Sequence, residues 1–308
     1  MRSIAGRRDF LIATCGVAAG LSLPGLSAAA APAQLTVEPL GDGLVVISGG
    51  GANVVALSGA EGLLVVDGGS AERSPELLKL LAGLPSGHHI HTVFNTHWHW
   101  DHTGSNELFR KAGATLMAHE NTRLWLGTPV WEAWQERRYP ARPKAQPTET
   151  FYKSGKLSFA GQPIEYGYLP QAHTDGDIYV YFRKQNVLVA GDVVSVGSYP
   201  ILDYCTGGWI GGMVDATQKL IDLSDDKTRI VPGNGPVQTR ADVAGEHEML
   251  AALKEDLWQL MRKGMGADDI IAAGATSKYD AKWGNPKLFV ANAYMGLYGH
   301  VREMRGVV

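Results

Sequence analysis

Residues 96–104 of the chain read Thr-His-Trp-His-Trp-Asp-His-Thr-Gly, which places three imidazoles and one carboxylate within six positions. In an extended segment alternate side chains face the same way, so we expect His97, His99 and Asp101 to converge while His102 faces the other side. The apolar run before this stretch predicts a buried strand, and the residues after it predict a turn into a helix. The sequence therefore places the histidines on a strand-to-helix loop, where metal and catalytic groups are commonly held.

The residue types in this stretch are zinc ligands. Neutral imidazole nitrogen and carboxylate oxygen both bind zinc, and a catalytic zinc site keeps one position open for water. No pair of closely spaced cysteines accompanies the histidines, so the pattern favours a catalytic metal centre over a structural zinc finger. The alternative is a solvated polar loop in which the histidines cluster by chance.

This stretch resembles the His-x-His-x-Asp-His signature of the metallo-β-lactamase superfamily, and further segments match that family in order along the chain. They are Gly-Leu-Leu-Val-Val-Asp-Gly-Gly at 62–69, Ala-His-Thr at 172–174, Gly-Asp at 176–177, Leu-Val-Ala-Gly-Asp at 188–192 and Val-Pro-Gly-Asn-Gly-Pro at 231–236. An ordered set of matches is far more specific than any one of them. The resemblance implies an α+β fold, a four-layer αββα sandwich, and it implies two neighbouring metal sites.

The resemblance assigns ligands to both sites. The first metal would be held by three imidazoles, those of His97, His99 and His173. The second would be held by Asp101 and His102, with Asp192 bridging the two metals. Asp67 is expected to accept hydrogen bonds that orient the metal loop.

One position departs from the family pattern. Asn234 stands where the family usually has histidine, and a neutral amide oxygen is a weaker zinc ligand than imidazole. We therefore expect one tightly bound Zn²⁺ and a second that binds weakly, or only when substrate or water completes its shell. A simple turn residue between two glycines is an equally good interpretation of Asn234.

Length and composition agree with a leader followed by one catalytic domain. The 308 residues are 45% hydrophobic and 19% charged, enough for a sizeable core. Residues 1–31 are interpreted as a twin-arginine-type signal peptide, because Arg7 and Arg8 precede a Gly- and Ala-rich apolar stretch and a small-residue cleavage site. A Sec signal or an uncleaved anchor is the alternative. We expect a periplasmic protein, with residues 32–308 forming the metallo-β-lactamase-fold domain and no stable membrane association after cleavage.

The charge argues against one class of partner, and the cysteine content bears on disulfide bonds. The formal net charge is −3, and the leader itself is positive, which argues against a nucleic-acid partner because nucleic-acid binding needs a positive face. Cys205 is the one cysteine beyond the leader, so the mature chain has no intrachain disulfide.

Hydrophobic periodicity predicts a β-rich first segment followed by alternating strands and helices. Strands are predicted at 35–40, 44–48, 54–57, 63–66, 92–95, 115–118, 164–168, 178–183, 187–190 and 228–231. Helices are predicted from 74, from 106 and from 121, and over 213–223 and 241–263. The proline-rich stretch 127–151 is interpreted as a loop or lid, and the aromatic stretch 197–212 as part of the mouth of the substrate pocket.

The implied chemistry is hydrolysis of a small molecule. Zinc lowers the pKa of its bound water, so a metal-bound hydroxide would cleave an amide, lactam, lactone, ester or thioester, with a β-lactam as one possibility. Asp101 would position the hydroxide and pass on its proton, and Arg137 or Arg138 would bind a substrate carboxylate. Two other classes stay open: a mononuclear iron oxidoreductase of the persulfide-dioxygenase type, and a binding protein that has lost catalysis.

Overall fold

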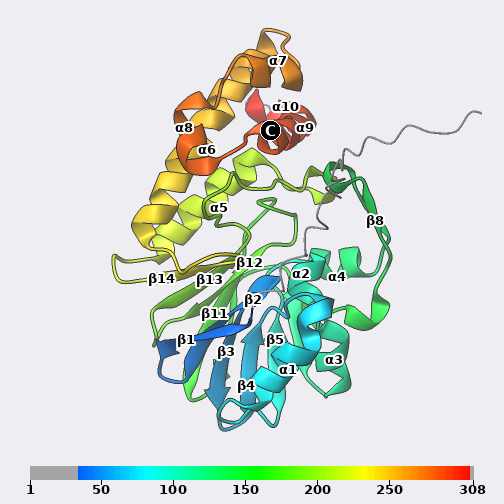
Figure 1. The fold of residues 1–308 in the computed structure, drawn as a ribbon, viewed down its shortest axis with the longest axis vertical. Helices are drawn as coiled ribbons and strands as arrows, with labels where there is room; N and C mark the ends of the chain where they lie inside the picture. Colours follow the sequence, from blue (N-terminus) through cyan, green and yellow to red (C-terminus); the bar gives the residue numbers. More distant parts are fainter. Residues whose placement is uncertain (1–33, 306–308) are drawn as a thin grey trace, which may run out of the picture. The chain divides into compact units, whose positions relative to one another are not determined.

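The computed structural model describes residues 34–305, so the signal peptide predicted at residues 1–31 lies outside the described residues. Strands form two main sheets (Figure 1). The first has the order β1-β2-β3-β4-β5-β6-β9, with β1 Thr36–Gly41, β2 Leu44–Gly50, β3 Ala52–Gly59, β4 Gly62–Val66, β5 Ile90–Phe94, β6 Thr115–His119 and β9 Glu149–Phe151. The second has the order β10-β11-β12-β13-β14, with β10 Gly155–Phe159, β11 Gln162–Tyr168, β12 Ile178–Phe182, β13 Val187–Gly191 and β14 Arg229–Pro232.

The two sheets pack face to face because their strands are apolar on both sides. On β3, Val55 and Leu57 belong to the cluster between the sheets, whereas Val54 and Ala56 belong to the cluster under the first helical layer. On β12, Val180 faces the other sheet. Side chains alternate between the two faces of a strand, so a strand that is apolar throughout must be covered on both faces.

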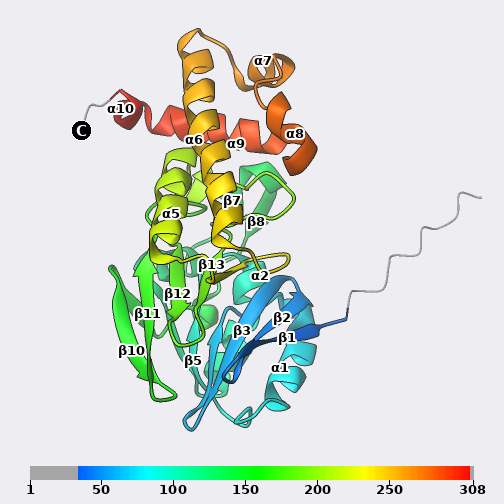
Figure 2. The ribbon, with the colours of Figure 1, turned by 90° about the vertical axis from the view of Figure 1, so that its left-hand side faces the viewer.

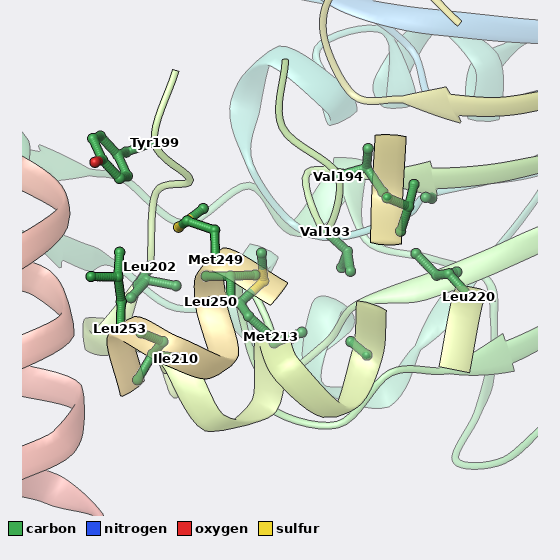
Figure 3. Close-up of a cluster of buried hydrophobic side chains, with 14 of the residues drawn as sticks. Val193, Val194, Tyr199, Leu202, Ile210, Met213, Leu220, Met249, Leu250 and Leu253 are labelled. Atoms are coloured by element: carbon green, nitrogen blue, oxygen red, sulfur yellow. The ribbon is translucent and has the colours of Figure 1, made fainter. Parts of the chain in front are cut away.

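Helices cover the outer face of each sheet. On the first sheet, α1 (Ser74–Ala82) contributes Leu77 and Leu81, and α3 (Asn106–Lys111) contributes Phe109. On the second sheet lie α5 (Ile210–Leu223) and α6 (Arg240–Arg262), which run side by side in Figure 2. Their apolar side chains pack together, as Figure 3 shows. The fold is therefore the four-layer αββα sandwich that the resemblance implied.

Several elements differ from those predicted from the sequence. The stretch 127–151 contains a hairpin of β7 (Val130–Glu132) and β8 (Arg137–Tyr139), followed by β9, which extends the first sheet beside β6. These strands have three residues each, too few to show a periodicity. After α6 the chain forms helices that we did not predict in detail, namely α7 (Ala267–Ala272), α8 (Ser277–Trp283), α9 (Lys287–Gly299) and α10 (Val301–Met304). Over residues 34–305, no helix has the length and apolar character needed to span a bilayer.

Replacing Phe182 with alanine is expected to lower the stability of the fold. The change should leave the histidine-rich stretch 96–104 after β5 unaltered. Phe182 is fully buried between the sheets, and phenylalanine-to-alanine changes in cores cost about 3–5 kcal/mol through lost burial and the cavity left behind. Urea unfolding followed by circular dichroism measures the loss. The matched control is Leu124→Ala on the exposed face of α4 (Glu120–Leu126), expected to change the free energy of unfolding by no more than about 0.5 kcal/mol. Equal effects of the two changes would contradict this packing.

Candidate metal centre

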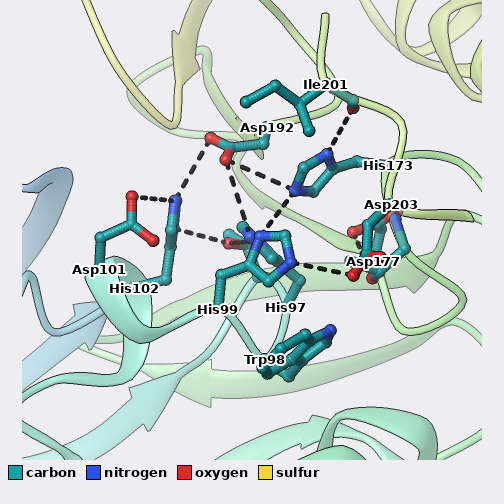
Figure 4. A network of polar contacts seen from close by, with 12 residues as sticks. His97, Trp98, His99, Asp101, His102, His173, Asp177, Asp192, Ile201 and Asp203 are labelled. Carbon is teal, nitrogen blue, oxygen red and sulfur yellow. Dashed lines mark hydrogen bonds and ion pairs between the residues drawn. The ribbon is translucent and has the colours of Figure 1, made fainter. Parts of the chain in front are cut away.

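The candidate ligands come from strand ends that meet at one edge of the two sheets (Figure 4). His97 and His99 follow β5, and α2 (Trp100–Thr103) carries the next two candidates. His173 lies in the turn between β11 and β12, and Asp192 directly follows β13. The extended conformation expected for residues 96–104 is therefore wrong beyond His99, because the chain turns into α2 there. Asp101 and His102 accordingly project from a helical turn.

Each of four buried imidazoles has a hydrogen-bond partner for its outer nitrogen, the one that faces away from the centre. His173 Nδ1 lies 2.8 Å from the carbonyl oxygen of Ile201, which can only accept, so this nitrogen carries the proton. His99 Nε2 lies 3.1 Å from Asp203 Oδ2. In the neutral form of both rings, the inner nitrogen therefore carries a lone pair and no proton.

The other two imidazoles share Asp67 and Thr96. His102 Nδ1 lies 2.8 Å from Asp67 Oδ2. Thr96 Oγ1 donates to the same carboxylate oxygen at 2.7 Å, which leaves the threonine oxygen to accept from His97 Nδ1 at 3.1 Å. Asp67 also accepts from the Thr96 backbone N–H at 2.8 Å. One carboxylate thus fixes the orientation of both rings.

The inner nitrogens face a common centre that needs a cation. His173 Nε2 and His99 Nδ1 are 2.9 Å apart, and two lone pairs at that distance repel unless a proton or a metal lies between them. Among the described residues, the buried Nε2 atom of His97 has no hydrogen-bond partner, and that of His102 has only an ion-pair contact with Asp192 at 3.3 Å. Buried polar atoms without partners are rare in folded proteins. This donor set fits a metal ion.

Asp192 connects two groups of ligands. Its Oδ2 lies 3.7 Å from His97 Nε2 and 3.6 Å from His173 Nε2, whereas its Oδ1 lies 3.3 Å from His102 Nε2. Asp101 Oδ2 is 3.9 Å from the same nitrogen of His102. His97, His99, His173 and Asp192 can converge on one ion. Asp101, His102 and the other oxygen of Asp192 form a second, smaller group beside them.

A glycine makes this close approach possible. Gly233 follows β14, and a Cβ atom there would lie 1.8 Å from Asp192 Oδ1 and 2.9 Å from His102 Cε1. Any other residue at this position would displace the bridging carboxylate. The next residue, Asn234, is exposed and borders the centre alongside His173 and Asp192.

Burial and charge set the protonation of the imidazoles without metal. Burial, with three neighbouring imidazoles adding to it, holds the pKa of His97 well below its ordinary value. Burial also lowers the pKa of His99, but the hydrogen bond to Asp203 and the charges of Asp203, Glu132 and Asp101 together outweigh it and raise the pKa to about 9. For His102 burial is again outweighed, by Asp192 and then Asp67, and the pKa lies well above the ordinary value. A metal ion must therefore displace protons from His99 and His102.

Two carboxylates near His99 did not emerge from the sequence. Asp203 is fully buried, and it also accepts from the backbone N–H of Cys205 and from the Thr206 hydroxyl. Glu132, on β7, is buried with Oε1 3.7 Å from His99 Nε2. Both lie in the stretches 127–151 and 197–212, which were expected to shape the pocket, but neither stretch has a motif that singles these acids out.

Two cavities open from the centre, and both are lined by His173, Asp192, Ile201 and Asn234. The larger has a volume of about 410 Å³ and extends beneath the β7–β8 hairpin. The smaller has a volume of about 180 Å³, and its walls include Val194, Val196 and Tyr199. Of the two expected carboxylate-binding arginines, Arg137 lines the larger cavity. Trp98 is buried, whereas Trp100 is half-buried and lines this cavity.

Comparison with known proteins agrees with this geometry. The sequence profile of the Metallo-beta-lactamase superfamily matches residues 47–237. The chain belongs to this superfamily. The match includes every candidate ligand from His97 to Asn234.

Two curated proteins are similar to this chain in sequence. One is the "Acyl-coenzyme A thioesterase MBLAC2" of Gallus gallus, 27% identical over 224 residues, which are 64% of this chain and 79% of the relative. The other is the "2,4-dinitroanisole O-demethylase subunit alpha" of Nocardioides sp. (strain JS1661), 25% identical over 249 residues, which are 77% of this chain and 68% of the relative.

Solved structures share the superfamily fold. A metallo-beta-lactamase from Pontibacter korlensis superposes with a TM-score of 0.56 at 20% identity, covering 71% of this chain and 99% of that one. The sec-alkylsulfatase Pisa1 from Pseudomonas sp. superposes with a TM-score of 0.65 at 17% identity, covering 84% of this chain and 50% of that one. At these identities the likeness establishes the fold.

We predict that Asp67→Asn weakens metal binding about 10- to 100-fold, the usual effect of removing a group that orients metal-ligating histidines. An amide has one acceptor oxygen where the carboxylate has two, so it cannot accept from the Thr96 backbone N–H at one position and from His102 and the Thr96 hydroxyl at the other. Competition with a chromophoric chelator measures the zinc affinity. Asp42→Asn, an exposed position paired with Lys184, is the control and should match wild type. A folded Asp67→Asn protein with wild-type affinity would remove Asp67 from this role.

Metal affinity is expected to fall as the pH falls. Below the pKa of about 9 the apoprotein holds a proton on His99, and the metal must displace it. One competing proton raises the apparent dissociation constant about tenfold per pH unit, and a second from His102 makes the dependence steeper. Chelator competition between about pH 8 and pH 6, corrected for the chelator's own protonation, measures the slope. An affinity that stays constant over this range would show that no imidazole proton is displaced.

Proposed function

We propose that this protein is a zinc-dependent hydrolase that cleaves an ester, thioester, lactone or amide bond in a small molecule, with β-lactams among the candidates. The observation that carries the proposal is the convergence of four imidazoles whose outer nitrogens all have partners and whose inner nitrogens meet. A divalent cation held there would lower the pKa of a bound water and polarise a carbonyl oxygen. The curated thioesterase relative supports the inclusion of thioesters.

Asp101 is the residue of this chain that is placed to accept the proton of the attacking water. Its side chain is 44% exposed and lines the larger cavity, so it can reach both water and substrate. A carboxylate in this position can orient the attacking water, accept its proton and pass the proton to the leaving group. His97, His99 and His173, by contrast, are buried and serve as ligands.

The two cavities give the two halves of a substrate separate places. A bond held beside Asp192 would have one half in the larger cavity and the other in the smaller one, whose walls include the aliphatic side chains of Val194 and Val196. Three histidines converge with Asp192, one imidazole more than the two-histidine, one-carboxylate set of mononuclear iron oxygenases. This favours zinc hydrolysis over the iron alternative.

Two further points stay part of the proposal. The Asp101–His102 group has Asn234 beside it in place of a third strong ligand, so we propose a second zinc that binds more weakly than the first. From the twin-arginine pattern in residues 1–31 we also propose that the protein acts in the periplasm.

Asp101→Asn should lower kcat about 10²- to 10⁴-fold, the range typical of losing a general acid or base, while zinc remains at the three histidines. Hydrolysis of an aryl ester, a phenyl thioester and a chromogenic cephalosporin by zinc-loaded protein measures the effect, with metal content determined on the same samples. Asp42→Asn is the matched control and should retain full activity. Zinc-loaded wild type that turns over none of these substrates would count against the proposal, as would an active Asp101→Asn protein.

A further inference from the structure

The wall of the larger cavity contains a buried acid whose function in the fold is not evident. Glu132 lines this cavity and is 2% exposed, and its Oε2 has no hydrogen-bond partner among the described residues. Trp134 lines the same wall. Its indole Nε1 also has no hydrogen-bond partner within residues 34–305. Burying a carboxylate without a partner costs several kcal/mol. A fold retains such a group where a ligand supplies the missing contact.

His99 does not supply the hydrogen bond that Glu132 lacks. Its Nδ1 faces the metal centre, so Nε2 is the nitrogen that can donate. That nitrogen lies 3.1 Å from Asp203 Oδ2 but 3.7 Å from Glu132 Oε1, which is beyond hydrogen-bond range. Asp203 takes the proton and has further donors in Cys205 and Thr206. Within the described part of the chain, Glu132 is left without a hydrogen-bond donor.

The cationic side chain on this wall does not neutralise Glu132. Arg137 is opposite Glu132 in the β7–β8 register, but its guanidinium lies over the ring of Tyr139, 4.7 Å from the centroid. Within residues 34–305 the two charges form no ion pair. Glu132 and Asp203 thus place two acids beside one imidazole. Burial raises the pKa of Glu132 to about 7, and a cation bound beside it would favour the ionised form.

A second metal ion does not suit this cluster. His99 Nε2 carries the proton donated to Asp203, so it offers no lone pair, and both oxygens of Asp203 already accept hydrogen bonds. A single free carboxylate is too few ligands for a bound metal. An ammonium group, by contrast, needs one or two acceptors and keeps its remaining N–H bonds for water or substrate oxygens.

We propose that Glu132 is a specificity residue that binds a protonated amino group on the substrate, so that the preferred substrates are amino-substituted esters, thioesters or lactones. The ammonium would occupy the larger cavity and donate to the Glu132 carboxylate, with Trp134 on the same wall. This inference rests on the proposed hydrolase function, because it places the amine in the cavity that borders Asp101 and Asp192.

The test compares matched esters in which a methyl group replaces the ammonium. Phenyl esters of glycine and β-alanine are paired with those of propionate and butyrate, and kcat/KM is measured with zinc-loaded protein at neutral pH. We expect wild type to prefer each amino ester by at least about tenfold over its partner after correction for the esters' intrinsic reactivity, since hydrogen bonds to charged groups have that magnitude. In Glu132→Gln the preference should fall to about one, with the neutral esters changed less than about twofold.

Glu136→Gln provides the matched control. It removes the same charge from an exposed position on the same hairpin, and it should keep the preference of wild type. Zinc content of each variant shows that His99 still binds metal. A wild type without preference, or a Glu132→Gln protein in which both ester classes slow equally, would overturn the proposal, and the second result would make Glu132 a positioning residue for His99.

A binding measurement separates failure of this inference from failure of the hydrolase proposal. The amino and neutral methyl ketones that mimic these esters cannot be hydrolysed, and calorimetry compares their affinities for wild type and Glu132→Gln. Tighter binding of the amino ketone by wild type alone supports the subsite even if no ester is cleaved. Equal binding of both ketones by wild type contradicts the subsite, whatever the protein hydrolyses.

Discussion

Four buried imidazoles with converging lone pairs are the constraint on which the site depends. Each ring is fixed by an acceptor behind it: a backbone carbonyl for His173, Asp203 for His99, and the Asp67–Thr96 pair for His97 and His102. Because these outer contacts use the single proton of each neutral ring, the inner nitrogens of the neutral rings have nothing to donate to one another. The sandwich thus holds together a set of donors that needs either a metal ion or added imidazole protons between them.

The acceptors come from distant parts of the chain. Asp67 and His102 are 35 positions apart, and His99 and Asp203 are 104 positions apart. Asp67 sits at the end of β4 with a left-handed φ of 65°, a conformation that aspartate tolerates better than most residues. The parallel β4–β5 pair brings this strand end beside the metal loop, and α5 and α6 support the second sheet from outside. The packing of the four layers is what brings the donors and their acceptors to one edge.

Much of this organisation could be predicted. Runs such as Val54–Leu57 and Leu63–Val66 predict strands covered on both faces, and the structure buries them so. The spacing of the histidines predicts a metal loop after a strand, and residues 96–104 occupy that place. The helical turn of Asp101 and His102 was not predicted, because four residues are too short for a 3.6-residue period to show.

The sequence by itself determined the superfamily, the sandwich and the chemical identity of the ligands, because these depend on local periodicity and on residue types that few other functions require together. Tertiary structure alone decided which nitrogen of each imidazole faces inward, that Asp192 connects two ligand groups, and that Glu132 and Asp203 meet at His99. Those features depend on contacts between segments far apart in the chain. No local pattern records such contacts, since an isolated acid in a loop has the same sequence signature whether it faces solvent or a metal ligand.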